Sequence, residues 1–135
     1  MKAKALILLN GMALFNLTLL AYPQTSAKQT ELLRGWLSDE QCAKGRAESG
    51  TFTSTNPECA KRCVSQGRKI VLVDPQGNRV LVLTNQDIGK SHIGDYVEIT
   101  GEVDSRQMTL HADSLKFLEK GVTMCDAPAK KSAAK

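Results

Sequence analysis

The chain has 135 residues, a formal net charge of +4 at neutral pH and only 4% aromatic residues. The positive charge comes from the two ends, because residues 28–125 hold 13 basic and 13 acidic residues and are neutral. A barrel that binds single-stranded nucleic acid needs a basic groove and aromatic stacking platforms. Composition therefore excludes nucleic acid as a partner.

Residues 1–27 predict a secretory signal peptide. Two lysines precede the mostly apolar residues 5–21, and small residues at 25–27 suit a signal peptidase. A transmembrane anchor is the competing interpretation. However, Asn10 and Asn16 interrupt a run that is already shorter than the ~20 residues of a membrane span.

Three parts follow from this layout. We expect a signal peptide over residues 1–27, a folded domain over 28–125 and a disordered basic tail over 126–135. The mature protein is then periplasmic or secreted, with no membrane association after cleavage.

The clearest strand lies within residues 94–103. Val97, Ile99 and Val103 alternate with polar residues, which is the pattern of a strand with one dry and one wet face. Gly101 interrupts the dry face, where a strongly bent barrel strand needs room. We therefore interpret this strand as half of the last hairpin of a small closed barrel.

The remaining pattern predicts a fold that is mainly β. In chain order we expect a strand at 32–39, a long loop at 39–55 with one helical turn near its start, a helix at 57–66, strands at 69–74 and 79–83, a short helix at 85–93, the strand at 94–103 and a last strand from 107. This is a small five-stranded OB-like barrel, with one helix between strands 1 and 2 and a short helix between strands 3 and 4.

Two features of the predicted strands are unusual. The strands at 69–74 and 79–83 are apolar on both faces, so they are either covered on both sides, in part by the 57–66 helix, or present a sticky surface. The last strand points Met108, Leu110 and Ala112 inward. A one-residue bulge near 113–114 would return Leu115 and Phe117 to the core.

Several short motifs share one order with a known group of proteins. They are Gly35-Trp36-Leu37-Ser38-Asp39 followed by Cys42, the pair Cys59 and Cys63, the segment from Gly67 to Val73, Asn85-Gln86-Asp87, and Val97-x-Ile99-Thr100-Gly101-x-Val103. Over residues 35–116 the chain resembles small exported bacterial proteins of uncharacterised function with an OB-fold-like domain. The resemblance implies export and a small barrel, and it transfers no catalytic residue. Cys125 is an addition to the usual pattern.

The cysteines are the only group of residues in the sequence that could carry out chemistry. Cys42, Cys59, Cys63 and Cys125 form an even set in a predicted exported domain, so we expect structural disulfides. Cys59 and Cys63 lie one helical turn apart, which disfavours a bond between them. We prefer the pairs Cys42–Cys63 and Cys59–Cys125 to the swapped arrangement, with each bridge stabilising the fold by about 2–4 kcal/mol.

A sharper alternative makes Cys59 and Cys63 a thiol-redox or copper-handling site. Thiolates favour copper(I), and His111, Met108 or Met124 could complete such a site. The spacing is neither the C-x-x-C of thioredoxin-like enzymes nor that of haem attachment. His92 and His111 fit solvent-facing positions.

Enzymatic chemistry has no support in the sequence. There is no nucleophile motif, and Asp39, Glu40 and Asp113 are interpreted as solvated carboxylates at loop edges. We therefore expect a monomeric, non-enzymatic binding or structural module without catalytic residues, cofactor or metal. Its partner would be a small ligand, a glycan or a protein, bound by the loop at 43–55 or by the apolar strands at 70–73 and 80–83.

Overall fold

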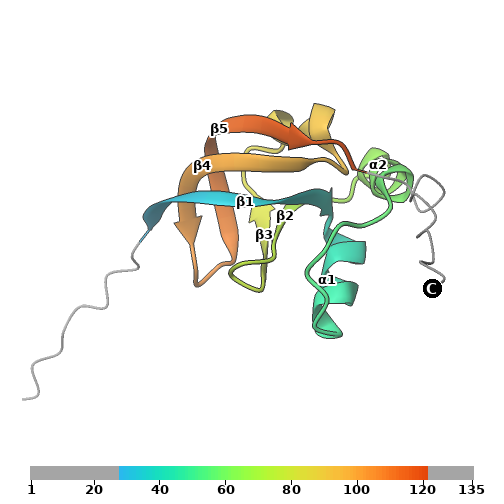
Figure 1. The fold of residues 1–135 in the computed structure, drawn as a ribbon, viewed down its shortest axis with the longest axis horizontal. Helices are drawn as coiled ribbons and strands as arrows, with labels where there is room; N and C mark the ends of the chain where they lie inside the picture. Colours follow the sequence, from blue (N-terminus) through green and yellow to red (C-terminus); the bar gives the residue numbers. More distant parts are fainter. Residues whose placement is uncertain (1–27, 122–135) are drawn as a thin grey trace, which may run out of the picture.

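The computed structural model describes residues 28–121 and is shown in Figure 1. The elements, in chain order, are β1 (Gln29–Asp39), α1 (Glu40–Glu48), α2 (Pro57–Ser65), β2 (Ile70–Asp74), β3 (Arg79–Leu83), the 3-10 helix η1 (Gln86–His92), β4 (Tyr96–Asp104) and β5 (Thr109–Glu119). The predicted signal peptide, the tail and Cys125 lie outside the described residues. Within residues 28–121, no helix has the length and apolarity needed to cross a membrane.

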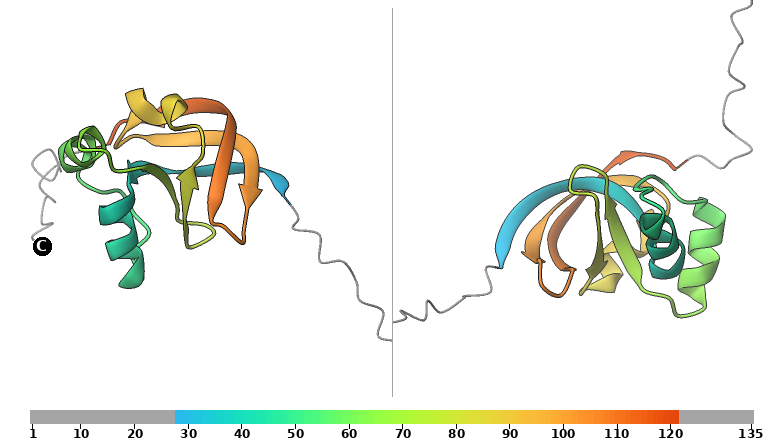
Figure 2. Two further views of the ribbon diagram at one scale, coloured as in Figure 1. Left: turned by 180° about the vertical axis from the view of Figure 1, so that it is seen from behind. Right: turned by 90° about the horizontal axis from the view of Figure 1, so that it is seen from below.

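The five strands form a closed barrel in the order β1–β2–β3–β5–β4, with β4 returning to β1 (Figure 2). Neighbouring strands are antiparallel except for β3 and β5, which close the barrel in parallel. This strand order and the position of η1 confirm the predicted mainly β, OB-like plan.

The barrel core is organised along β4. Val97, Ile99 and Val103 are fully buried, which confirms the predicted dry face. A Cβ atom at Gly101 would overlap the carbonyl oxygen of His111 on the neighbouring strand, so the bend requires glycine. The core also contains Leu33, Leu37, Ala60, Ile70, Leu72, Leu81, Leu83, Ile93, Leu110 and Ala112.

The predicted bulge in the last strand is present. Thr100 pairs with Ser114 and Gly101 pairs with Ala112, which leaves Asp113 as the extra residue of β5. The inward and outward faces of β5 therefore exchange at this point, as a single inserted residue requires.

For two residues of the last strand, the prediction that the side chain lies in the core is wrong. Leu115 packs against the core, but Met108 is 39% exposed and Phe117 is 46% exposed. Met108 has a positive φ of 54° and belongs to the β4–β5 turn, before β5 begins. Phe117 lies on the part of β5 beyond its parallel pairing with β3, where only β4 is paired with it.

The main correction concerns residues 39–55, which do not form one long loop. Residues Glu40–Glu48 form α1, whose first turn is capped by the Asp39 carboxylate. Lys44 pairs with Glu40 one turn earlier, and Ala43 is buried against the sheet. Because its other residues are mostly polar, α1 has no apolar stripe from which periodicity could predict it.

The two helices divide their roles differently from the prediction. Ala60 and Val64 of α2 pack into the main barrel core. The outer faces of β2 and β3 are instead covered by α1, where Ala43, Val71, Val73 and Val80 form a second cluster. Trp36, Ala47, Phe52 and Val82 pack against this cluster.

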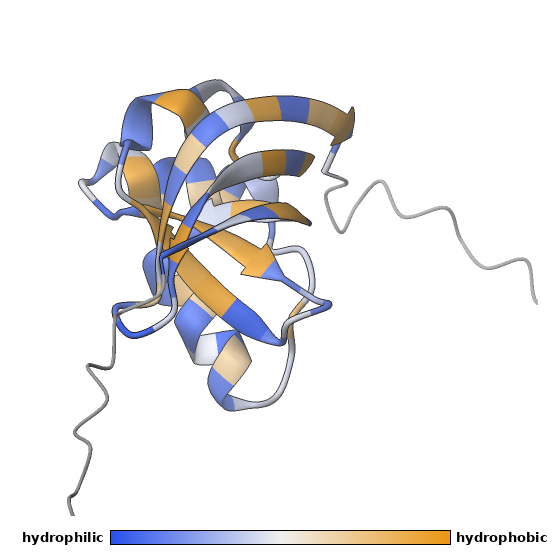
Figure 3. Cartoon of the chain, turned by 90° about the vertical axis from the view of Figure 1, so that its left-hand side faces the viewer, coloured by the Kyte–Doolittle hydropathy of each residue, from blue (hydrophilic) through white to orange (hydrophobic). Residues whose placement is uncertain are grey.

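Both faces of the apolar hairpin are therefore covered by the chain itself. Every residue of β2 is buried, and in β3 only Arg79 and Val82 are partly exposed. Figure 3 shows this hairpin as an almost continuous apolar stretch, whereas the curved outer strands alternate. This burial removes the two strands as a free docking surface.

Candidate thiol site

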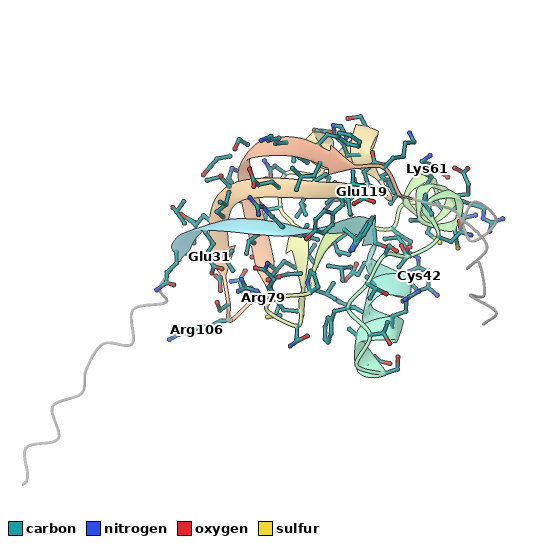
Figure 4. All side chains as sticks on the ribbon, in the orientation of Figure 1. Glu31, Cys42, Lys61, Arg79, Arg106 and Glu119 are labelled. Atoms are coloured by element: carbon teal, nitrogen blue, oxygen red, sulfur yellow. The ribbon has the colours of Figure 1, made fainter. Side chains whose placement is uncertain are left out.

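Helices α1 and α2 lie at one end of the barrel (Figures 1 and 2). Three cysteines of these two helices come together there. Cys42 lies in the first turn of α1, and its backbone N–H donates to the Asp39 carboxylate at 2.9 Å. Cys59 and Cys63 lie one turn apart on α2. Figure 4 shows Cys42 on the part of α1 nearest to α2. The two capped helix starts thus determine where the thiols lie.

The segment between the helices is anchored beside this site. Ser38, at the end of β1, and Thr55, just before α2, form a buried hydrogen bond between their hydroxyl groups. The side chain of Asn56 caps α2 by accepting from the backbone N–H groups of Glu58 and Cys59. These contacts place the start of α2 relative to the end of β1 and hence to α1.

The sulfur atoms of Cys42, Cys59 and Cys63 all lie within 4.8 Å of one another. All three side chains are partly exposed, and all three are free thiols. No two of these sulfurs lie at the bonding distance of about 2.05 Å, so the predicted Cys42–Cys63 bond is not formed in this structure. The predicted Cys59–Cys125 pair involves a residue outside the described part of the chain.

The surroundings of the thiols favour their protonated form. Burial, followed by the Asp39 carboxylate and the Cys59 thiol, raises the pKa of Cys42 to about 12. The pKa of Cys63 is also raised, first by burial and then by the Asp39 carboxylate and Cys59, while a hydrogen bond with Cys42 acts in the opposite direction. Reactive cysteines of redox enzymes have lowered pKa values in electropositive surroundings. The surroundings of this cluster instead raise the pKa values of its thiols.

Asp39 is the residue that sequence reasoning misjudged most. Its side chain is fully buried, not solvated at a loop edge. Oδ1 caps α1, and Oδ2 has no hydrogen-bond partner within residues 28–121. An aspartate followed at once by the acidic Glu40 is a helix-start signal that could have revealed both the helix and the capping role of Asp39.

A cavity of about 390 Å³ opens beside two of the thiols. Its lining residues are Gln41, Cys42, Gly45, Arg46, Thr55, Asn56 and Cys59. The lining contains no acidic side chain among the described residues, and Arg46 is its one cation. Small molecules can therefore approach the sulfurs of Cys42 and Cys59 from this side.

The other residues named as copper ligands do not join the cluster. His111 shares a hydrogen bond of 2.9 Å with Thr84, and His92 lies near Asp95. Met108 lines a separate pocket with Phe52 and Val80. Met124 lies outside the described residues. Among residues 28–121, the group of potential metal ligands at this site consists of the three cysteines.

Comparison with protein-family models, with curated proteins and with solved structures finds no match. The resemblance to small exported bacterial proteins therefore remains a prediction from the motifs.

Proposed function

We propose that this protein is a non-enzymatic barrel module that binds a soft metal ion, copper(I), through the thiolates of Cys42, Cys59 and Cys63. The observation that carries the proposal is the convergence of three free thiols from two helices within 4.8 Å. Thiolate ligands select soft ions such as copper(I). The predicted signal peptide would place this activity outside the cytoplasm.

The spacing of the sulfurs supports a three-coordinate site. With metal–sulfur bonds of about 2.3 Å, three sulfurs in a trigonal plane lie about 4.0 Å from one another. The observed limit of 4.8 Å leaves less than about 1 Å of adjustment, which rotation of partly exposed side chains can supply. Zinc normally takes a fourth ligand, and residues 28–121 supply three at this site, which makes copper(I) the better fit.

Thiol-redox catalysis is the weaker alternative for the same residues. A redox cysteine acts as its thiolate, and the raised pKa of Cys42 and Cys63 opposes that form. A metal ion overcomes this by displacing the thiol protons when it binds. The raised pKa values therefore count against nucleophilic attack, whereas the case for metal binding rests on the convergence of the three sulfurs.

Titration of the reduced protein with copper(I) under anaerobic conditions tests the proposal. A chromophoric chelator that competes for copper(I) reports both stoichiometry and affinity. We expect one ion per chain and a loss of affinity of at least about a hundredfold when any one of the three cysteines is replaced by serine. Cys125→Ser, at a position outside the described residues, tests whether a fourth thiol joins the site, and a three-coordinate site predicts that its affinity is unchanged.

A measurement of the thiol state of the exported protein could contradict the copper(I) proposal. If alkylation and mass spectrometry find Cys42, Cys59 and Cys63 engaged in disulfides that resist mild reductants, the cysteines are structural staples. The copper proposal would then be wrong, and the original expectation of a disulfide-stabilised module would take its place.

A further inference from the structure

We propose that the cavity between α1 and the start of α2 is the route by which a small thiol that carries a carboxylate exchanges the metal ion. This inference rests on the proposed copper(I) site and adds its exchange partner. The cavity has a volume of about 390 Å³, which is large enough for a ligand the size of a dipeptide or tripeptide thiol.

Access to the sulfurs is the first requirement, and the cavity meets it. Cys42 and Cys59 belong to its lining, and Cys63 does not. An incoming thiol would therefore reach two of the three ligands while the third still holds the ion.

Arg46 supplies the recognition of a negative group. It lies four residues after Cys42 on α1, so both side chains project from the same side of the helix. Its Nη2 donates to the Thr53 hydroxyl at 2.6 Å, whereas its buried Nε has no hydrogen-bond partner among the described residues. A carboxylate that enters the cavity can pair with the Arg46 guanidinium in a charge-assisted hydrogen bond, and a turn of the side chain would bring the unsatisfied Nε to it.

Gly45 keeps the cavity open. It lies inside α1, between Cys42 and Arg46, where an alanine would favour the helix more. A Cβ atom built on Gly45 meets nothing within 4 Å, so no packing constraint requires glycine here. A bulky side chain at this position, unlike the single methyl group of alanine, would occupy the space in front of the thiols.

The exchange step leaves copper in the +1 state. The incoming thiol loses its proton to solvent as its sulfur bonds to the ion. The bond from the ion to Cys42 or Cys59 then breaks, and the released sulfur takes up a proton. Two such replacements use two molecules of the small thiol. Cys63 then leaves and takes up a proton from solvent, so that the ion is held by the two small thiolates, and the reverse sequence loads the protein.

Gly45→Trp tests the route without changing a ligand, and Gly45→Ala is its matched control. Copper-loaded protein is mixed with glutathione as the probe, and loss of the copper–thiolate absorption is followed by stopped flow. We expect Gly45→Trp to slow the exchange by at least about tenfold by filling the cavity. The equilibrium affinity for copper(I) should stay within about twofold, since the ligands are unchanged. Gly45→Ala should exchange like the unmodified protein.

Arg46→Gln tests recognition of the carboxylate. We expect exchange with glutathione to slow about tenfold and exchange with the uncharged thiol 2-mercaptoethanol to stay the same. Thr53→Val removes a partner of Arg46 without removing its charge, so it should preserve the preference for glutathione.

The outcomes separate the two proposals. Loaded Gly45→Trp that exchanges as fast as the unmodified protein would overturn this inference, as would Arg46→Gln that slows both thiols equally. In either case the copper(I) site itself would stand. A protein that binds no copper(I) would overturn the proposed function and the exchange route together.

Discussion

Asp39→Asn isolates the electrostatic role of the buried carboxylate beside the thiols. Asparagine retains the oxygen that accepts the N–H of Cys42, and it caps helices as well as aspartate does. We therefore expect α1 to form and the fold to be retained. Asp39→Ala would be less informative, because loss of the cap costs about 1 kcal/mol and loosens the helix that carries Cys42.

The expected direction is tighter copper(I) binding. Three neutral thiols become a dianionic complex when three thiolates hold one copper(I) ion, and the buried Asp39 carboxylate repels that charge. The pKa of Cys42 is about 12, against an ordinary value of 9.0, and Asp39 is the second cause after burial. If removing the charge lowers this pKa by about one, the apparent affinity near neutral pH rises about tenfold.

The assay is chelator competition at constant pH on the reduced protein. Glu40→Gln is the control, since Glu40 is the neighbouring acid and is paired with Lys44 near the surface. We expect this control to change the affinity by less than about twofold. Weaker binding by Asp39→Asn would refute the reasoning, because it would mean that the carboxylate itself ligates the ion.

Three further predictions concern the barrel and the thiols. Ile99→Asp should unfold the domain, because an unpaired buried charge costs several kcal/mol, whereas Glu98→Ala on the outer face should cost less than about 1 kcal/mol in urea denaturation; equal effects would mean that the strand faces are misassigned. Gly101→Ala should lower the free energy of unfolding by more than about 1 kcal/mol through overlap with the β5 backbone, while Gly45→Ala in open space should raise it by about 0.5–1 kcal/mol; thermal melts that rank the two in the opposite order would contradict the backbone geometry. In the reduced, metal-free protein, Cys42 is almost entirely protonated at about pH 8, because its pKa is about 12. Its alkylation by iodoacetamide should therefore be at least about a hundredfold slower than in denaturant, and the rate should rise as the pH approaches this pKa. Equal rates in the folded and denatured protein would show that the thiol is not desolvated.

Most of the fold could be predicted from the alternation of apolar and polar residues along the strands. The alternation around Ile99, the parity change at Asp113 and the turn before Arg79 depend on neighbours within a few residues, and all three appear in the structure. Gly101 was predictable for the same reason, because a glycine on a dry strand face implies close approach of another backbone. Local periodicity is strong evidence wherever burial alternates with each residue.

The errors have a different origin. α1 forms through a cap at Asp39 and through two small residues, Ala43 and Ala47, that rest on the outer face of the β2–β3 hairpin. Neither contact produces an apolar stripe along the chain, so composition favoured a loop. Phe117 was misplaced because parity places a side chain on one face of a strand but does not reveal where the barrel stops covering that face.

The composition and local pattern of this chain were sufficient to predict the class of fold and the order of its strands, and they marked the cysteines as the residues to examine. The barrel plan also predicted that Cys42 and the cysteines of the 57–66 helix meet at one end of the barrel, as three of them do, but how closely the sulfurs approach was decided only in three dimensions. Cys42 and Cys59 are brought together by a helix that the pattern concealed, by the Ser38–Thr55 contact and by closure of the barrel beneath both helices. Alternation reports which side of an element is buried, but the distance between two sulfurs depends on how separate elements pack, and that is set by contacts between residues distant in the chain.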